Sequence, residues 1–299
     1  MTTAEKSDVQ AAGAGCGDQP EAFRLRIDLA YVGRDFQGWQ IQATARTVQG
    51  ELRHLISRVL DRPVTPVGAG RTDTGVHARG QVAHVALRSQ AECDRLIRAL
   101  PGMVPRDIAV TAIGRVSPAF NARLSATSRR YSYHLLLGRD IFRPFCWQLG
   151  RDLDRAAVDR AAAYLPGPHD FTSFCKAASL KDDGNVCDVT LCSFEWGPDT
   201  AILHVRANRF LHHMVRNLVG FMVEAGYGRR DPHDIPRVLD ARSRAAAGGM
   251  APPQGLFLEE VTYPEHLLDP DDRTDPGQSP SSTAESPVPG SSAPTGETT

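Results

Sequence analysis

The sequence has no run of eighteen apolar residues, the length that a helix needs to cross a bilayer. Its first twenty residues lack the basic-then-apolar pattern of a secretory signal peptide. No two cysteines form a CxxC pair, the spacing typical of zinc and redox sites, and the six are scattered: Cys16, Cys93, Cys146, Cys175, Cys187 and Cys192. These absences predict a soluble, non-secreted, cytoplasmic protein with reduced thiols, no bound metal and no contact with a membrane.

Lysine is nearly absent, since only three of the 34 basic residues are lysine. The net charge of −1 is also unevenly distributed: residues 1–22 carry −3, residues 265–299 carry −6, and residues 23–264 therefore carry about +8. The planar guanidinium of arginine suits phosphate and stacks on nucleobases, although a GC-rich genome would also favour arginine codons. A basic body between acidic tails indicates a polyanionic partner.

Three common nucleotide and metal motifs are missing as well. A phosphate loop needs Lys and then Ser or Thr after its last glycine, and here a valine follows Gly75. The dinucleotide fingerprint needs a glycine where Asp73 stands. The pair His212-His213 is not part of the His-Glu-x-x-His motif of metalloproteases.

What the chain does contain is a glycine-rich stretch, residues 68–84, around a single carboxylate, Asp73, with Arg71 and His77 close to it in sequence. Glycines at this density let the backbone adopt conformations closed to other residues and let another molecule come close. A carboxylate beside an arginine, with no second acid nearby, suits a nucleophile better than an acid–base pair. The alternative is a surface turn in which Asp73 bonds its own backbone and pairs with Arg71.

Hydrophobic periodicity predicts an alternation of strands and helices. The expected strands are residues 23–30, 63–67, 81–87, 108–113, 131–137, 186–196, 201–207 and 251–263, and the expected helices are residues 47–60, 94–100, 155–165 and 209–224. The turn Gly197-Pro-Asp199 predicts a hairpin of the strands 186–196 and 201–207. Over the first half, the order strand, helix, strand, strand, helix, strand is that of the ferredoxin-like split unit, which RNA-recognition modules often use.

Composition divides the chain into four parts. Residues 1–22 and the acidic, Pro/Ser-rich residues 265–299 are predicted to be disordered. A proline-containing segment without periodicity near residue 145 marks the boundary between an N-terminal α/β domain, residues 23–145, and a C-terminal α/β domain, residues 146–264. The polar segment 176–185 is expected to be mobile.

Arg216 lies four residues after His212 in an otherwise apolar predicted helix. An unpaired arginine turned into a core costs several kcal/mol, so it needs an acidic partner, and Asp73 is a candidate. Tyr131 and Tyr133 share one face of a predicted strand, where they either cap the sheet or form a surface for stacking. The aromatic residues in the segment 31–39 leave the same choice open, since they could stack on bases or cover the core.

Five separated motifs occur in the order found in the TruA family of tRNA pseudouridine synthases, which the chain resembles over residues 23–264. They are GRTDTGVH at 70–77, SATSRRY at 125–131, DFTSF at 170–174, HHMVRN at 212–217 and GLFL at 255–258. The resemblance implies isomerisation of uridine to pseudouridine in the tRNA anticodon stem-loop, just 3′ of the anticodon (tRNA positions 38–40). It also implies a homodimer, no metal and no cofactor. The implied fold is α+β, with two ferredoxin-like (RNP-like) domains that share a continuous, mostly antiparallel sheet and a central basic cleft.

Matched motif by motif, the resemblance implies that Asp73 is the nucleophile and that Arg216 is the arginine paired with it. Tyr131 would stack on the target uracil, Arg71 would help to hold the flipped-out nucleotide, and Leu256 would form an apolar wall of the pocket. Two other interpretations stay open. One is a tRNA chaperone of the same fold that leaves its RNA unaltered, and the other is a metal-dependent nuclease built on Asp73 and the two adjacent histidines.

Overall fold

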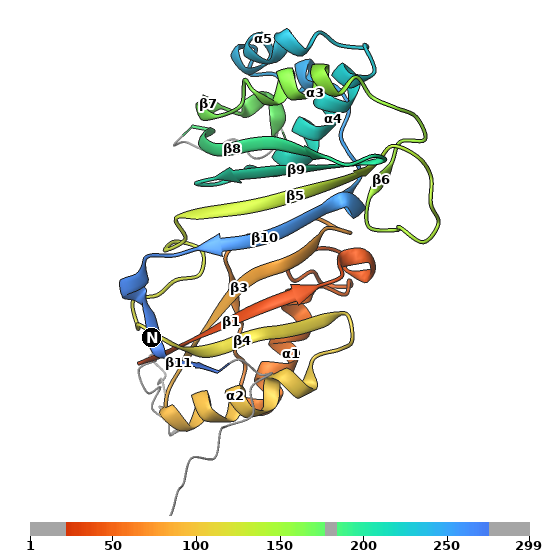
Figure 1. Ribbon diagram of the computed structural model, residues 1–299. Helices are drawn as coiled ribbons and strands as arrows, with labels where there is room; N and C mark the ends of the chain where they lie inside the picture. Colours follow the sequence, from red (N-terminus) through yellow and green to blue (C-terminus); the bar gives the residue numbers. More distant parts are fainter. Residues whose placement is uncertain (1–21, 177–183, 275–299) are drawn as a thin grey trace, which may run out of the picture.

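A large sheet runs from one end of the molecule to the other in the computed structural model, which describes residues 22–176 and 184–274 (Figure 1). The strands are β1 (Phe23–Tyr31), β2 (Val67–Gly68), β3 (His77–Leu87), β4 (Ile108–Val116), β5 (Ser128–Leu136), β6 (Trp147–Gln148), β7 (Gly167–Asp170), β8 (Val186–Trp196), β9 (Thr200–Ala207), β10 (Leu256–Thr262) and β11 (Leu268–Thr274). The helices are α1 (Val48–Leu60), α2 (Gln90–Met103), α3 (Arg155–Ala162), α4 (Met214–Gly226) and α5 (Ile235–Asp240). This mixed α/β architecture agrees with the prediction.

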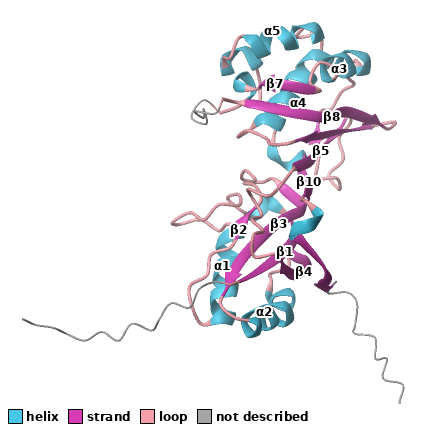
Figure 2. Ribbon diagram, turned by 90° about the vertical axis from the view of Figure 1, so that its left-hand side faces the viewer, coloured by secondary structure: helices cyan, strands magenta, loops and turns pink. Residues whose placement is uncertain are grey.

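The strand order along the sheet is β11-β4-β1-β3-β10-β5-β9-β8-β7, with β2 paired to β3 and β6 paired to β5. The sheet is mostly antiparallel, and the two parallel contacts are β10 with β3 and β5 with β6. In the N-terminal half, β1 lies between β3 and β4, and helices α1 and α2 lie together beside these strands (Figure 2). In the C-terminal half, β8 and β9 form the predicted hairpin, and α3, α4 and α5 lie at the opposite end of the molecule (Figure 2).

The late strand β10 joins the two halves, because it lies between β3 and β5. Leu258 of β10 is paired with Ala78 of β3 on one side and with Tyr131 of β5 on the other. The strand that follows the Asp73 loop and the strand that carries Tyr131 are therefore separated by the width of one strand. This pairing is the feature of the fold that assembles the site described below.

Side-chain caps fix where the helices begin. The Thr47 hydroxyl accepts a hydrogen bond from the Gly50 amide at 3.2 Å, so α1 begins at Val48, close to the predicted start. The Ser89 hydroxyl accepts a hydrogen bond from the Glu92 amide at 3.3 Å, and α2 therefore begins at Gln90 rather than at residue 94. It also continues past the predicted end, with Pro101 inside its last turn.

Other predicted boundaries are wrong as well. The helix expected over residues 209–224 begins at Met214, because His213 has a left-handed backbone (φ 68°) that α-helical residues do not adopt. The tail expected to be disordered from residue 265 contains a strand, because Leu268–Thr274 pairs with β4 as an edge strand, β11. The predictions for residues 1–21, 177–183 and 275–299 lie outside the described residues. Within the described ranges, no helix is long and apolar enough to span a bilayer.

Candidate active site

Asp73 lies on the loop between β2 and β3, and a second loop holds it from behind. The Trp39 amide donates to the Thr72 carbonyl at 3.1 Å, and the Tyr31 hydroxyl lies 2.8 Å from the Thr72 hydroxyl. A Cβ on Gly38, whose φ is +82°, would come within 2.7 Å of the same Thr72 carbonyl oxygen, so this close approach requires glycine. The loop that displays Asp73 is thus fixed by its neighbour rather than free in solvent.

This support explains the aromatic segment 31–39, for which the sequence left two interpretations. Tyr31, Phe36 and Trp39 are at most 4% exposed and belong to the core. The interpretation that they cover the core is confirmed. The alternative view of Asp73 as a surface turn paired with Arg71 is wrong, because Arg71 forms no hydrogen bond or ion pair with the residues that the structure describes.

Three cationic or basic side chains, one from the first turn of α4 and two from the residues just before it, converge on the Asp73 carboxylate. Arg216 donates from Nη1 to Oδ2 at 3.1 Å, His212 places Nε2 3.2 Å from Oδ1, and His213 places Nε2 3.5 Å from Oδ2. The Arg216 side chain is 10% exposed and that of Asp73 is 18% exposed. The structure therefore brings Asp73 and Arg216 together. This agrees with the expectation that a buried arginine needs an acidic partner.

Backbone contacts and backbone conformation near Arg216 orient these three side chains toward Asp73. Its Nε donates to the Ala251 carbonyl at 2.8 Å, which leaves Nη1 directed at Asp73. The left-handed residue His213 turns the chain sharply just before α4, so both histidines face the carboxylate although they are adjacent in sequence. Burial lowers the pKa of His213 below that of a free histidine, so this ring is mostly neutral near pH 7. The sequence identified the two histidines only as a candidate metal motif.

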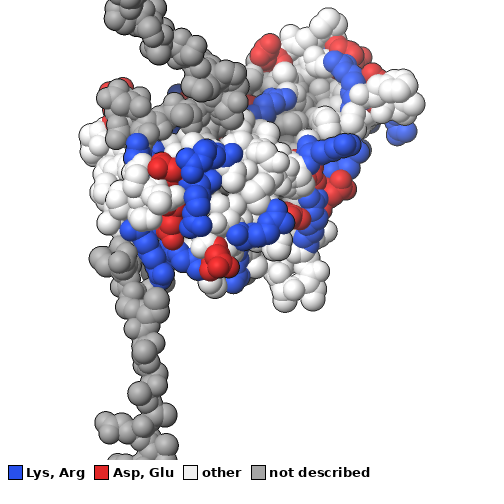
Figure 3. Space-filling model, turned by 90° about the horizontal axis from the view of Figure 1, so that it is seen from below, with Lys and Arg blue, Asp and Glu red and all other residues white. Residues whose placement is uncertain are grey.

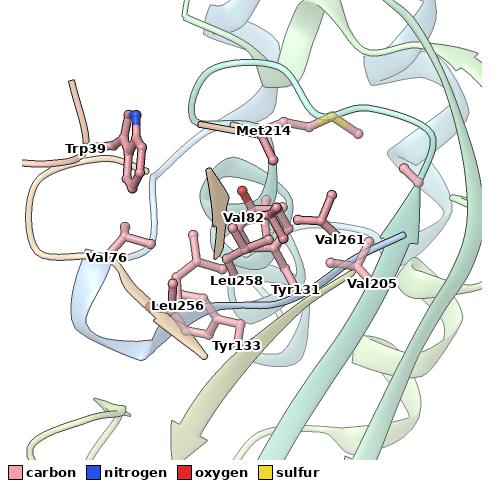
Figure 4. Packing of buried hydrophobic residues seen from close by; sticks show 14 of the residues in the cluster. Trp39, Val76, Val82, Tyr131, Tyr133, Val205, Met214, Leu256, Leu258 and Val261 are labelled. Atoms are coloured by element: carbon pink, nitrogen blue, oxygen red, sulfur yellow. The ribbon is translucent and has the colours of Figure 1, made fainter. Parts of the chain in front are cut away.

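The pocket also contains the tyrosine and the leucine that the resemblance singled out. Tyr131 is 8% exposed, and its ring meets that of Phe210 edge-on at 5.1 Å between centroids. Burial, with the nearby Asp73 charge, raises its pKa far above the ordinary value, so it stays a neutral phenol. Leu256, 6% exposed, lies on β10 near Tyr131 and lines the same pocket (Figure 4).

The pocket in front of these residues has a volume of about 1540 Å³, larger than a typical small-molecule site. Asp73 is the one carboxylate among the described residues that line it. The basic residues that line it are Arg71, Arg123, Arg129, Lys176, Arg209 and Arg216. On the molecular face seen from below, by contrast, acidic and basic side chains are interleaved (Figure 3). The pocket thus combines one acid with a basic rim, which suits a substrate that carries phosphates.

Asp73, His212 and His213 could in principle share a metal ion, since their ligand atoms lie within 4.8 Å of one another. The Arg216 guanidinium, however, already lies 3.1 Å from the same carboxylate. Its permanent positive charge repels a second cation at that position. We therefore describe the cluster as an ion-pair centre and assign no metal ligands in it.

The DFTSF motif at residues 170–174 does not line the pocket but supports it. The Asn217 side chain, fully buried in α4, donates to the Phe174 carbonyl at 2.6 Å. The Lys176 amide, just after the motif, donates to the His212 carbonyl at 3.0 Å. The motif therefore fixes the segment that carries His212 and Arg216, a role that only the folded chain reveals.

Comparisons with known proteins agree with this geometry. A protein-family profile described as tRNA pseudouridine synthase matches residues 161–264. Curated proteins named tRNA pseudouridine synthase A match most of the chain. The protein from Moorella thermoacetica is 44% identical over 244 residues, covering 80% of this chain and 99% of its own. Those from Cereibacter sphaeroides and Halalkalibacterium halodurans are 42% and 38% identical, over 81% and 85% of this chain and 97% of theirs.

A solved structure of a dye-decolorizing protein from V. cholerae aligns over 86% of this chain and 95% of that one, but at 12% identity and a TM-score of 0.21. A score this low supports no conclusion about shared architecture. The curated relatives are different, because identities near 40% extend over nearly their full length. The resemblance predicted from five ordered motifs is confirmed, and the chain belongs to the tRNA pseudouridine synthase A family of isomerases.

Proposed function

We propose that the chain isomerises uridine to pseudouridine in tRNA, with Asp73 as the nucleophile. The observation that carries the proposal is Asp73, the one carboxylate among the described residues that line the pocket, paired with Arg216 at 3.1 Å and surrounded by basic side chains. The reaction breaks the C1′–N1 bond of uridine, turns the base and forms a C1′–C5 bond. A proton leaves C5 and one is gained at N1, so nothing is oxidised and no second substrate is needed. One carboxylate suffices for covalent catalysis of this kind.

Asp73 can act by three routes: attack on the sugar C1′, addition to uracil C6, and assistance of a glycal intermediate. In each, Arg216 orients the carboxylate through its contact with Oδ2. The target base must leave its stack, which costs a few kcal/mol. In our proposal Tyr131 offsets part of this cost by stacking on the uracil, Leu256 forms an apolar wall beside it, and Arg71 holds the flipped nucleotide.

We place the target in the anticodon stem-loop, at tRNA positions 38–40, and propose that the enzyme acts as a homodimer without a cofactor. Family membership is the basis for both statements. We further propose that each half of the chain is a ferredoxin-like domain. The strand order β4-β1-β3-β2 in the first half, with α1 and α2 beside it, supports this assignment. Sedimentation of the purified protein would test the dimer directly.

The decisive experiment uses purified protein and an unmodified tRNA transcript, without added metal or nucleotide, and maps pseudouridine by chemical labelling. We expect modification just 3′ of the anticodon. Asp73→Asn is expected to bind the transcript and leave every uridine unmodified. The matched control is Asp35→Asn, an exposed acid on the neighbouring loop that does not line the pocket, and it should modify tRNA normally. Normal turnover by Asp73→Asn would refute the catalytic role.

The same experiment separates the alternatives. A tRNA chaperone of this fold would bind the transcript but yield no pseudouridine with the wild-type protein. A nuclease that used Asp73, His212 and His213 to hold a metal would cleave the transcript, and a chelator would abolish that cleavage. Modification that proceeds in the presence of a chelator, with the tRNA intact, supports the isomerase.

A further inference from the structure

Arg129, two residues before Tyr131, donates to four backbone carbonyls at once. Its Nη1 binds the carbonyl oxygens of Asn208 at 2.8 Å and Ala126 at 3.0 Å, and its Nη2 binds those of Arg123 at 2.9 Å and Ala69 at 3.2 Å. A guanidinium presents its donors in a rigid planar fork, so four simultaneous acceptors fix its position and are fixed by it.

The four carbonyls belong to the three segments that surround the pocket. Ala69 lies four residues before Asp73, on the loop that displays it. Arg123 and Ala126 lie on the connection between β4 and β5, which lines another side of the pocket. Asn208 begins the connection from β9 to α4, which leads to the two histidines. One side chain thus ties together segments that are far apart in sequence and that contribute different parts of the site.

The charge of Arg129 has no acidic counterpart among the residues that the structure describes, and burial lowers its pKa. A buried guanidinium needs a hydrogen-bond acceptor for its N–H donors, and here four backbone carbonyls accept from them. A carboxylate partner would have neutralised the charge. Its absence leaves the positive charge of Arg129 beside a pocket that already has a basic lining.

We infer that Arg129 is a positioning residue: it sets the Asp73 loop against the connection that carries His212 and leads to Arg216. The expected effect on the reaction rate rests on the proposed isomerase function. The clamp itself, Arg129 with its four carbonyl partners, does not depend on that function. Arg129 touches neither the carboxylate nor the Arg216 guanidinium. It acts on the reaction by fixing the distance between their parent segments, and a misplacement of about 1 Å can lower a rate about a hundredfold.

The test compares Arg129→Lys and Arg129→Met with a matched control, Arg230→Lys. Arg230 also donates to a backbone carbonyl, that of Ala246, and pairs with Glu224, but it does not line the pocket. A lysine keeps the charge but cannot bind four carbonyls arranged around a planar fork. For Arg129→Lys we expect kcat for pseudouridine formation to fall at least about tenfold, and the Kd for tRNA to change less than about threefold. Arg230→Lys should keep the wild-type kcat, even where its melting temperature falls.

Hydrogen–deuterium exchange supplies a readout that does not need activity. Amides in residues 66–76 and 205–213 should exchange about tenfold faster in Arg129→Lys than in Arg230→Lys. Unchanged exchange in both segments would overturn the inference, and so would a kcat within twofold of wild type or a defect confined to tRNA affinity. If the wild-type protein formed no pseudouridine, the proposed function would fail, and exchange would still decide whether Arg129 is a clamp. Arg129→Met, which removes the charge as well, should exchange at least as fast as Arg129→Lys, and slower exchange would count against the clamp.

Discussion

The Arg216 guanidinium joins the Asp73 carboxylate to the backbone of Ala251: Nη1 contacts Oδ2 at 3.1 Å while Nε donates to the Ala251 carbonyl at 2.8 Å. The two charged residues are 143 positions apart in the sequence. With one nitrogen anchored to the chain, the guanidinium has little freedom to leave the carboxylate. The pair is therefore a preorganised feature of the site, of the kind that catalysis requires.

Replacing Arg216 by lysine should separate charge from geometry. An ammonium keeps the positive charge but cannot reach Asp73 and the Ala251 carbonyl with the same fixed spacing. We expect kcat to fall about a hundredfold in Arg216→Lys, with tRNA affinity within about threefold of wild type. Single-turnover kinetics and filter binding measure the two quantities. A rate close to that of wild type would show that any cation beside Asp73 is sufficient.

Removing the Tyr131 hydroxyl tests whether the ring alone is used. The hydroxyl makes no hydrogen bond with the described residues, and it belongs to a side chain that lines the pocket. We expect Tyr131→Phe to fold normally, to bind tRNA within about threefold of wild type and to lower kcat, because a buried phenol without a protein partner is free to bond the substrate. Tyr131→Ala should lose affinity as well, since stacking on a base contributes about 1–3 kcal/mol. Wild-type turnover by Tyr131→Phe would assign the whole contribution to the ring.

The affinity for tRNA should fall steeply with salt, because the basic side chains around the pocket replace condensed counterions. Arg71 is exposed there and forms no ion pair with the described residues, so its full charge is available to a phosphate. In Arg71→Ala we expect the slope of log affinity against log salt to become shallower by about 1. The control is Arg237→Gln, an exposed arginine paired with Asp234 on α5, which should leave the slope unchanged. A flat salt response in the wild-type protein would contradict the role of the basic rim.

The sequence predicted that Arg216 needs an acidic partner because a charge in an apolar helix is costly, and the resemblance to a known family implied that Asp73 is that partner. It predicted the hairpin of β8 and β9 because a plain Gly-Pro-Asp turn lies between the two predicted strands. These inferences depend on local pattern or on a strong energetic requirement. A local pattern and an energetic requirement can both be recognised from the sequence alone.

Other features depend on contacts between distant segments, and no local pattern reports them. The insertion of β10 between β3 and β5 is one case, since pairing partners are not encoded in the alternation of a strand. Arg129 is another: its four carbonyl partners are backbone groups, which every residue carries. The left-handed backbone of His213, which ended the predicted helix early, likewise follows from its contacts rather than from its type.

Two buried histidines should make the fold sensitive to acid. His77 and His84 are each 2% exposed, and the Nδ1 atom of each accepts a backbone amide, from Gly33 at 3.1 Å and from Ala122 at 3.0 Å. Burial lowers the pKa of each from 6.5 to about 4. Between pH 6.5 and 4 the unfolded chain binds these protons and the folded chain does not, so the free energy of unfolding should fall with decreasing pH. The slope is about 1.4 kcal/mol per pH unit for each histidine.

Urea unfolding at pH 7, 6 and 5 measures this slope, and His84→Gln isolates one contribution. The variant loses the titrating group, so its stability should depend less on pH by up to about 1.4 kcal/mol per unit below pH 6.5. His54→Gln, an exposed histidine on α1, should show the wild-type dependence. A general effect of losing one histidine would alter the pH dependence of both variants alike, whereas an effect of burial would alter only that of His84→Gln. If the stability of His84→Gln depended on pH as steeply as that of the wild type, the neutral His84 ring that accepts the Ala122 amide would not be a source of the acid sensitivity. Other groups would then have to cause it.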